Sequence, residues 1–483
     1  MVYNYFQKTI KSYSFTNWIV LILFIKLILF VFYAIQYHIY PELSLKHGFL
    51  YVVAGDTSTY YPPIINVLAG GDYGNACRMP GLFPVFAPFY YLSNNLEFSY
   101  NAVIIIQFIV STISVYVLGL ISLLLFDDKK IFLITIILYS LFYHIGDHFL
   151  LADSLANSTL IFGTYFYLKS LKQKFEQKKD IFISGLFFAW SIFIRLIGII
   201  PFFALFALLI YFVFYKNQKI VKTITIALLF SLCFIVFESA WVLRNKISLN
   251  RTLFFTVPEC YSSFSYNWLE LAKIPTAWGH ETTPWIGEIK WWLNKDAQAK
   301  EFNFPDEVLT KNFTVDSLTK LKKQYYTHAL KGEGVYSVSL DFKEKVRSYL
   351  HEYKSEHFID YYVFHPLKLF FKFHYKKMIV DIPFPKYEKM SLFQKGFKVI
   401  NWIVLLIISL VFLFFAPVSL LFNRKLPYVV FLVIPFTISF FLCFIMGAIE
   451  QRYFWPIVPF AIVFFGYFIQ FVISFFKKKI FKT

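Results

Sequence analysis

The chain has 483 residues, of which 58% are hydrophobic and only 16% are charged. Soluble domains are nearer half apolar and a quarter charged, so this composition excludes an ordinary soluble protein and indicates an integral membrane protein. The formal net charge is +18. Because a good share of that charge lies in short lysine-rich connections between apolar runs, it indicates membrane topology, and no nucleic-acid partner is expected.

Ten apolar runs follow one another along the chain, each near the length of about 20 residues that a helix needs to cross a bilayer, although two of them are short. They predict an all-α polytopic membrane protein with about ten spans. The runs cover residues 17–37, 101–126, 131–146, 149–168, 181–195, 198–215, 223–243, 398–422, 428–446 and 453–476.

The short connections after the second, fourth, sixth and eighth runs are basic, and so are both ends of the chain. Cytoplasmic loops carry such an excess of Lys and Arg, and all these segments share one side in a ten-span arrangement. We therefore expect both termini in the cytoplasm and a multi-pass protein in a bacterial inner (plasma) membrane. The basic residues are Lys8, Lys11, Lys129, Lys130, Lys169, Lys172, Lys174, Lys178, Lys179, Lys216, Lys219, Lys222, Arg424, Lys425, Lys477, Lys478, Lys479 and Lys482.

The same topology predicts three parts. Residues 1–245 form an N-terminal transmembrane module with a long first outer loop at 38–100. Residues 246–397 are far more polar and are long enough for a small domain of their own. The spacing of apolar residues there favours helices, so we expect an α-rich soluble insert on the periplasmic side. Residues 398–483 form a C-terminal transmembrane module.

Acids and arginines gather at the outer ends of the predicted spans, although lysine dominates the basic residues elsewhere. Polar residues near a bilayer are costly and tend to mark function. The planar fork of Arg pairs with phosphate, and a nearby carboxylate can accept a proton from an attacking hydroxyl. The pattern therefore favours an outer substrate such as a lipid-linked sugar phosphate. The set comprises Asp56, Asp72, Arg78, His144, Asp147, His148, Asp153, Arg195, Glu238, Arg244, Arg251, Glu450 and Arg452.

Structural roles explain single members of this set equally well. An arginine at the end of a span also reaches lipid headgroups, and Arg452 can pair with Glu450. Asp72, in GGDYG, is typical of a turn cap, which we favour. Asp56 is placed to cap a short helix as readily as to act in catalysis.

Metal ligands are only weakly indicated. His144 and His148 are four residues apart, which suits one face of a helix. No third ligand accompanies them, so no cofactor is evident and a metal is left open.

Five segments together resemble the glycosyltransferase family 39-like membrane enzymes, which include protein O-mannosyltransferases and the aminoarabinose transferases that modify lipid A. Each motif is loose, but their order and their common side of the membrane are specific. They cover most of residues 50–255 and 440–470. The segments are GDTSTYYPPIINVLAGGDYGNACRMPGLFPVFAPFYYL, LADSLANSTLIFGTYFYL, SGLFFAWSIFIRLIGIIPFFALFALLIY, WVLRNKISLNRTLFF and EQRYFWPIVPFAIVFFGY.

This resemblance implies the C-type glycosyltransferase fold and an inverting transfer from a polyprenyl-phosphate sugar to a hydroxyl of a lipid, glycan or protein acceptor at the periplasmic face. The family's first-loop acid corresponds to Asp56, as the base. Many relatives have an Asp-Glu pair there, whereas Thr57 follows here, and the insert matches no known module of the family. The implied donor-phosphate residues are Arg78, Arg195, Arg244 and Arg452, and the implied acceptor or sugar contacts are Asp147, His148, Asp153 and Glu450.

Other classes of membrane protein remain as alternatives. A flippase or transporter of lipid-linked sugars would use the same arginines during passage, but it would also place polar residues through the depth of the membrane and sites on both faces. A glycan polymerase or ligase would use similar chemistry. A non-catalytic scaffold would not require this set of acids and arginines.

Overall fold

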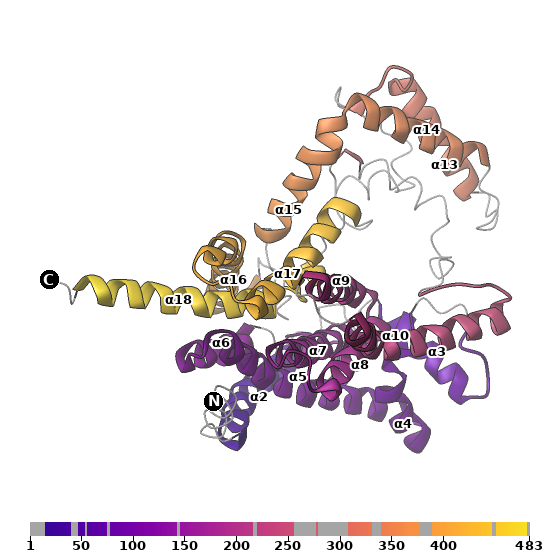
Figure 1. Ribbon diagram of the computed structural model, residues 1–483. Coiled ribbons are helices and arrows are strands. Elements are labelled where there is room, and N and C mark those ends of the chain that lie inside the picture. Colours follow the sequence, from indigo (N-terminus) through magenta and orange to yellow (C-terminus); the bar gives the residue numbers. More distant parts are fainter. Residues whose placement is uncertain are drawn as a thin grey trace. The chain divides into compact units, whose positions relative to one another are not determined.

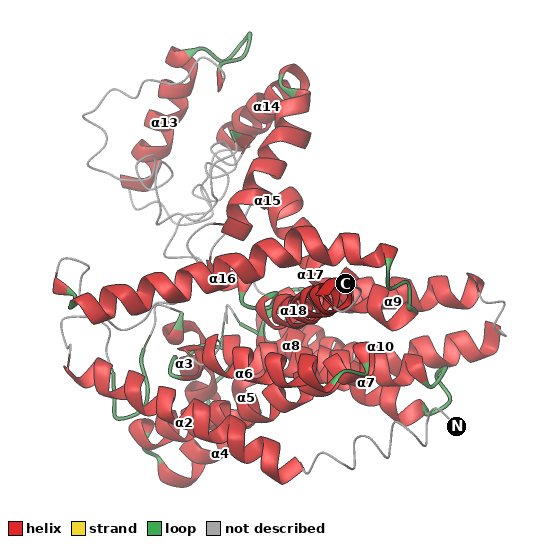
Figure 2. Ribbon diagram, turned by 90° about the vertical axis from the view of Figure 1, so that its left-hand side faces the viewer, coloured by secondary structure: helices red, strands yellow, loops and turns green. Residues whose placement is uncertain are grey.

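The computed structural model is built almost entirely of helices (Figure 1). Two isolated β-bridges are the only strand-like pairing in the part of the chain that the structure describes (Figure 2). The chain divides into two compact units, which we call the membrane unit (1–257, 377–437 and 455–483) and the insert unit (258–376 and 438–454). The described residues are 15–39, 47–53, 56–74, 78–142, 145–215, 220–255, 277–278, 308–330, 340–375, 389–446 and 451–480.

Each of the ten predicted apolar runs coincides with a helix. Two further helices, α3 and α4, lie in the predicted first outer loop. The twelve helices are α2 (Phe15–Ile39), α3 (Thr57–Leu68), α4 (Phe83–Ser93), α5 (Leu96–Phe126), α6 (Lys129–Phe142), α7 (Asp153–Lys172), α8 (Lys178–Ile194), α9 (Ile199–Tyr215), α10 (Ile220–Leu249), α16 (Leu392–Val418), α17 (Leu426–Phe440) and α18 (Val458–Ile480).

Six helical stretches are long and apolar enough to cross a membrane, so the protein is a multi-pass membrane protein. Helices α6, α7, α8 and α9 fall short of that standard. The 14 residues of α6 span only about 21 Å, against a hydrocarbon core of about 30 Å. The ten-span count therefore stays a prediction. The six stretches are Thr16–Gln36, Leu96–Phe126, Ile220–Leu249, Leu392–Leu421, Leu426–Met446 and Val458–Lys477.

Small residues bring the central helices of the membrane unit together. Helix α7 packs between α5 and α8, and α8 packs in turn against α10. Ser184 of α8 donates a hydrogen bond of 2.8 Å to the carbonyl of Gly163 in α7. Gly185 lies against the backbone carbonyl of Phe230 in α10, where a side chain would clash. Small residues allow such close approach of helices, which dispersion and hydrogen bonds then stabilise.

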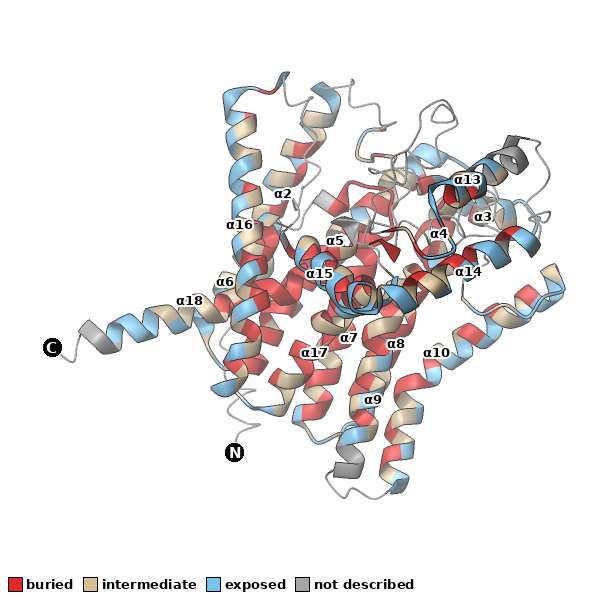
Figure 3. Ribbon diagram, turned by 90° about the horizontal axis from the view of Figure 1, so that it is seen from above, coloured by how far each residue is buried: buried red, intermediate tan, exposed pale blue. Residues whose placement is uncertain are grey.

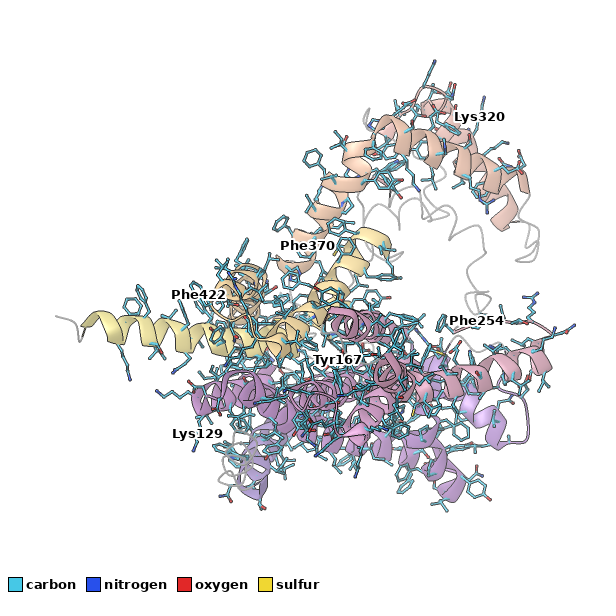
Figure 4. The ribbon with its side chains drawn as sticks, viewed as in Figure 1. Lys129, Tyr167, Phe254, Lys320, Phe370 and Phe422 are labelled. Carbon is cyan, nitrogen blue, oxygen red and sulfur yellow. The ribbon has the colours of Figure 1, made fainter. Side chains whose placement is uncertain are left out.

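The alternating direction of these helices sorts their charges to two ends. Lysines lie where α5 meets α6 and where α7 meets α8. The other end holds the α6–α7 and α8–α9 turns and the last turns of α10. Figure 4 shows Lys129 at one end of the unit and Phe254 at the other. We call this second end the site end, because the predicted functional residues lie there.

The described part of the insert unit has its own small core. Trp278, Val346 and Tyr353 are buried in it. The indole N–H of Trp278 donates to the hydroxyl of Tyr349 at 2.5 Å, and that hydroxyl donates to the carbonyl of Val308 at 2.7 Å. The helices of the unit are α13 (Val315–Leu330), α14 (Leu340–Glu356), the π-helical turn η8 (Asp360–Phe364), α15 (His365–Tyr375), the π-helical turn η11 (Phe441–Met446) and the 3-10 turn η12 (Gln451–Phe454).

Candidate active site

The segment before α3 is fastened to the turn between α6 and α7. The amide of Val52 donates to the carbonyl of His148 at 2.9 Å, and the amide of Leu150 donates back to Val52 at 3.0 Å. The hydroxyl of Thr57 donates to the carbonyl of Leu150 at 3.0 Å. Because Thr57 is the first residue of α3, these bonds fix the beginning of α3, and with it Asp56, over the α6–α7 turn.

Asp56 and Arg78 form an ion pair at this point. A guanidinium N–H of Arg78 (Nη2) donates to Oδ2 of Asp56 at 2.9 Å, and Nε–H donates to the hydroxyl of Thr59 at 3.2 Å. The guanidinium also lies over the ring of Tyr60. The side chains of Asp56 and Arg78 are 27% and 23% exposed, so both remain within reach of a substrate.

This geometry distinguishes the two roles considered for Asp56, which are capping a short helix and acting in catalysis. By position it is the N-cap residue of α3, but its side chain makes no capping hydrogen bond to the helix. Its backbone carbonyl accepts from the amide and the hydroxyl of Thr59. The carboxylate is therefore directed to Arg78 and not to the helix, which suits a role in chemistry better than a role as a cap.

A second ion pair, between Asp153 and Arg195, lies next to the segment that carries Arg78. Asp153 begins α7 and Arg195 directly follows the last residue of α8, and their side chains are 3% and 9% exposed. Gly81, three residues after Arg78, packs directly on the backbone of Phe193 and Ile194. The indole of Trp190 donates to the carbonyl of Gly81 at 3.0 Å. The segment that carries Arg78 therefore rests on the end of α8, next to Arg195.

Arg244 of α10 forms the third pair. Its Nη2–H group donates to Oδ1 of Asp72 at 3.0 Å and to the carbonyl of Gly74 at 2.7 Å. The guanidinium also lies against the rings of Tyr73 and Trp241. Slight burial raises the pKa of Asp72, but hydrogen bonding and the charge of Arg244 outweigh it and lower that pKa below its usual value. Backbone hydrogen bonds from Tyr73 and Gly74 lower it further, so Asp72 caps its own turn, as we favoured, and also pairs with a distant arginine.

A buried lysine and its partner were missed by sequence reasoning. Lys26, inside the first apolar run, forms a buried ion pair of 2.8 Å with Asp147. Oδ2 of Asp147, which faces Lys26, also accepts a hydrogen bond from the hydroxyl of Ser111 in α5 at 2.8 Å. Oδ1 of Asp147 accepts one from the hydroxyl of Ser154 in α7. A lysine in the middle of an apolar run was the available signal, because such a charge is tolerated only with a partner.

Asp147 and His148, predicted as contacts for acceptor or sugar, are both buried. The imidazole of His148 stacks on Phe30 at a ring distance of 4.0 Å. Burial lowers the pKa of His148 to about 4, so the ring is neutral near pH 7. Both residues hold the α6–α7 turn against its neighbours, which favours a structural role over contact with a sugar.

The remaining predicted residues are not brought into this cluster by the described structure. His144 and Glu450 lie outside the described residues. The backbone of Arg452 belongs to η12 of the insert unit, and its side chain is not described. Among the side chains that the structure does describe, no three His, Cys, Asp or Glu lie close enough to hold a metal ion.

Comparisons with known proteins add structural likeness but no close relative. No protein-family model matches the sequence, and no curated protein matches it. One similar solved structure is the archaeal oligosaccharyltransferase AglB from Archaeoglobus fulgidus, in complex with an inhibitory peptide and a dolichol-phosphate. The two chains share 12% sequence identity at a TM-score of 0.44, and the aligned region covers 94% of this chain and 50% of AglB. Another is ArnT from Cupriavidus metallidurans bound to undecaprenyl phosphate, with 12% identity, a TM-score of 0.35, and 94% and 78% coverage. This chain thus spans half the length of AglB.

Proposed function

We propose that this protein is a membrane glycosyltransferase of the C-type fold that moves a sugar from a polyprenyl-phosphate donor to an acceptor hydroxyl at the periplasmic face. The observation that carries the proposal is the accessible Asp56–Arg78 pair, fastened beside the Asp153–Arg195 pair. Together they place a carboxylate that can accept a proton next to guanidinium groups that can bind phosphate.

The proposed reaction is a single displacement with inversion. The acceptor oxygen attacks the anomeric carbon and forms the new glycosidic bond, while the bond from that carbon to the phosphate oxygen breaks. Polyprenyl phosphate leaves with the bonding electron pair, and the acceptor proton passes to the carboxylate of Asp56. Arg78, with Arg195 and Arg244 as further candidates, stabilises the negative charge on the departing phosphate. Such preorganised electrostatic stabilisation often lowers the barrier of an enzymatic reaction more than any other effect.

The Asp56–Arg78 bond suggests an order of events. A guanidinium on a carboxylate makes that carboxylate a weaker base. A donor phosphate competes for Arg78, and its binding therefore releases Asp56 to accept a proton. In this proposal the base is weak while the site is empty and becomes effective once the donor has bound.

The test is transfer from a panel of radiolabelled polyprenyl-phosphate sugars by the purified full-length chain, with a membrane extract as acceptor. We expect wild-type transfer from at least one donor, and a loss of about 100-fold in Arg78→Gln, the size expected when one charge-stabilising donor is removed. Arg251→Gln is the matched control, because exposed Arg251 lies at the same end but outside the three pairs. Movement of a lipid-linked sugar across liposomes without transfer would instead support a flippase.

A further inference from the structure

Two consecutive helical stretches of the insert unit expose opposite kinds of side chain. The outer face of α14 is polar, as expected for a helix in water. The stretch from residue 358 to 371, which includes η8 and most of α15, exposes large apolar side chains instead. Figure 3 shows exposed and buried residues following one another along α14. On α14 the exposed residues include Glu344, Lys345, Arg347, His351 and Ser355. The exposed apolar residues of the second stretch are Phe358, Ile359, Tyr362, Val363, Phe364, Leu367 and Phe371.

Helix α15 has three distinct faces. Leu369 and Phe373 are 3% exposed and face inward, with the ring of Phe373 lying 5.2 Å from that of Phe454. Leu367 and Phe371, four residues apart and 37% and 45% exposed, form an outer apolar face that continues to Phe364. Lys368 and Lys372 follow those two residues by one position each, and so form a basic strip along one edge of the apolar face.

The inner face of α15 rests on the end of an apolar stretch. It packs against η11, which is the last part of the membrane-length segment Leu426–Met446. The ring centroid of Phe370, which is labelled in Figure 4, lies 6.3 Å from the ring centroid of Phe444 in η11. The end of a span lies at the level of the lipid headgroups, so this packing holds α15 at the same depth.

We propose that η8 and α15 form an interfacial element that lies in the outer surface of the bilayer. Its apolar face, Phe364, Leu367 and Phe371, enters the boundary between headgroups and acyl chains. Lys368 and Lys372 extend toward lipid phosphates, as lysines at such boundaries do. The partner is the protein's own membrane, rich in anionic lipid, and the proposal is independent of any transferase activity.

The first test measures the surroundings of single spin labels on the full-length chain in nanodiscs of phosphatidylethanolamine and phosphatidylglycerol. The four natural cysteines are replaced by serine, and labels are attached at Leu367→Cys or Phe371→Cys. Ser355→Cys on the polar face of α14 is the matched control. Because all three positions are exposed, the fold should tolerate them, as size-exclusion chromatography would verify.

Oxygen concentrates in the bilayer and a water-soluble nickel complex does not. We expect the ratio of oxygen to nickel accessibility to be several-fold higher at positions 367 and 371 than at 355. Water-like ratios at all three positions would overturn the proposal. Exclusion of both reagents at 367 and 371 would also overturn it, because it would mean that protein covers this face.

The lysine strip has its own test in the same labelled chain. Lys368→Glu/Lys372→Glu should lower the accessibility ratio at Leu367→Cys in nanodiscs that contain phosphatidylglycerol, and much less in nanodiscs of phosphatidylcholine alone. An equal change in both lipids would contradict a role for these lysines in binding anionic headgroups.

Discussion

At the scale of residues, each described arginine of the proposed site is held by an aspartate. The three pairs join Arg78 to Asp56, Arg195 to Asp153 and Arg244 to Asp72. They differ in exposure: the side chains of Asp153 and Arg195 are buried, whereas those of Asp56 and Arg78 are partly exposed. We therefore assign proton transfer to Asp56 and the main phosphate contact to Arg78, with Arg195 of the buried pair as a further candidate for that contact.

His148 gives a pH prediction at this scale. Burial lowers its pKa from 6.5 to about 4, so the folded state stays neutral while the unfolded chain takes up a proton below pH 6.5. Stability is thus fully present above pH 6.5 and falls as the pH is lowered toward 4, by about 3 kcal/mol in all. Thermal unfolding midpoints in detergent should fall between pH 6.5 and 5 in the wild type and fall less in His148→Gln.

Exposed His38 supplies the matched control for this experiment. His38→Gln should keep the wild-type dependence on pH. An equal slope in wild type and His148→Gln would show that the imidazole of His148 is not buried in its neutral form.

At the scale of elements, helices could be predicted from the sequence and their contacts could not. The ten apolar runs are local patterns, and each coincides with a helix. The partner of Arg244 lies 172 positions away in the chain, and no local pattern encodes such a pairing. Lys26 was missed for the same reason, because its partner Asp147 is supplied by a turn between two other helices.

Gly81 tests whether the first outer loop must rest on α8. A methyl group there would meet the backbone of Phe193 and Ile194, which cannot move aside as a side chain can. We expect Gly81→Ala to destabilise the protein by about 1–3 kcal/mol and to reduce transfer. Gly396→Ala is the control, since nothing lies within 4 Å of its added methyl group. Equal midpoints for the two variants would contradict the close packing at Gly81.

The Lys26–Asp147 pair predicts strong coupling between α2 and the α6–α7 turn. Removing one partner leaves the other charge buried and unpaired. Lys26→Met and Asp147→Leu should therefore each lower the free energy of unfolding by about 3–5 kcal/mol. The double variant should lose much less free energy of unfolding than the two single variants lose together, because neither charge is then left alone. Unfolding of the four proteins in detergent measures this coupling, and strictly additive costs would argue against the pair.

At the scale of the whole molecule, composition alone identified a membrane protein, and six stretches have the length and apolarity of spans. The division into units was harder to predict. The insert unit includes residues 438–454 as well as 258–376, although the sequence assigned the former to the C-terminal transmembrane module. Apolar side chains at 441–446 follow the pattern of a span, and only the packing of α15 against them shows their second role.

Orientation is testable with cysteines in a chain whose natural cysteines are replaced by serine. Leu92→Cys, at the end of α4, lies at the site end, and Lys425→Cys lies in the basic connection between α16 and α17. A maleimide that cannot cross membranes should label Leu92→Cys in intact cells and Lys425→Cys only after permeabilisation. The reverse pattern would place the proposed site in the cytoplasm.

The central claim is that Asp56 is the base of a polyprenyl-phosphate-dependent glycosyl transfer. Its most direct test is the single-turnover rate of sugar transfer by wild type and Asp56→Asn, with donor binding measured on the same preparations. Removal of a general base predicts a rate lower by about 100- to 10,000-fold, with donor binding retained because Arg78 remains. The control Asp127→Asn, at an exposed aspartate where α5 meets α6 at the opposite end of the unit, should keep near wild-type transfer. Transfer by Asp56→Asn at the wild-type rate would contradict the account.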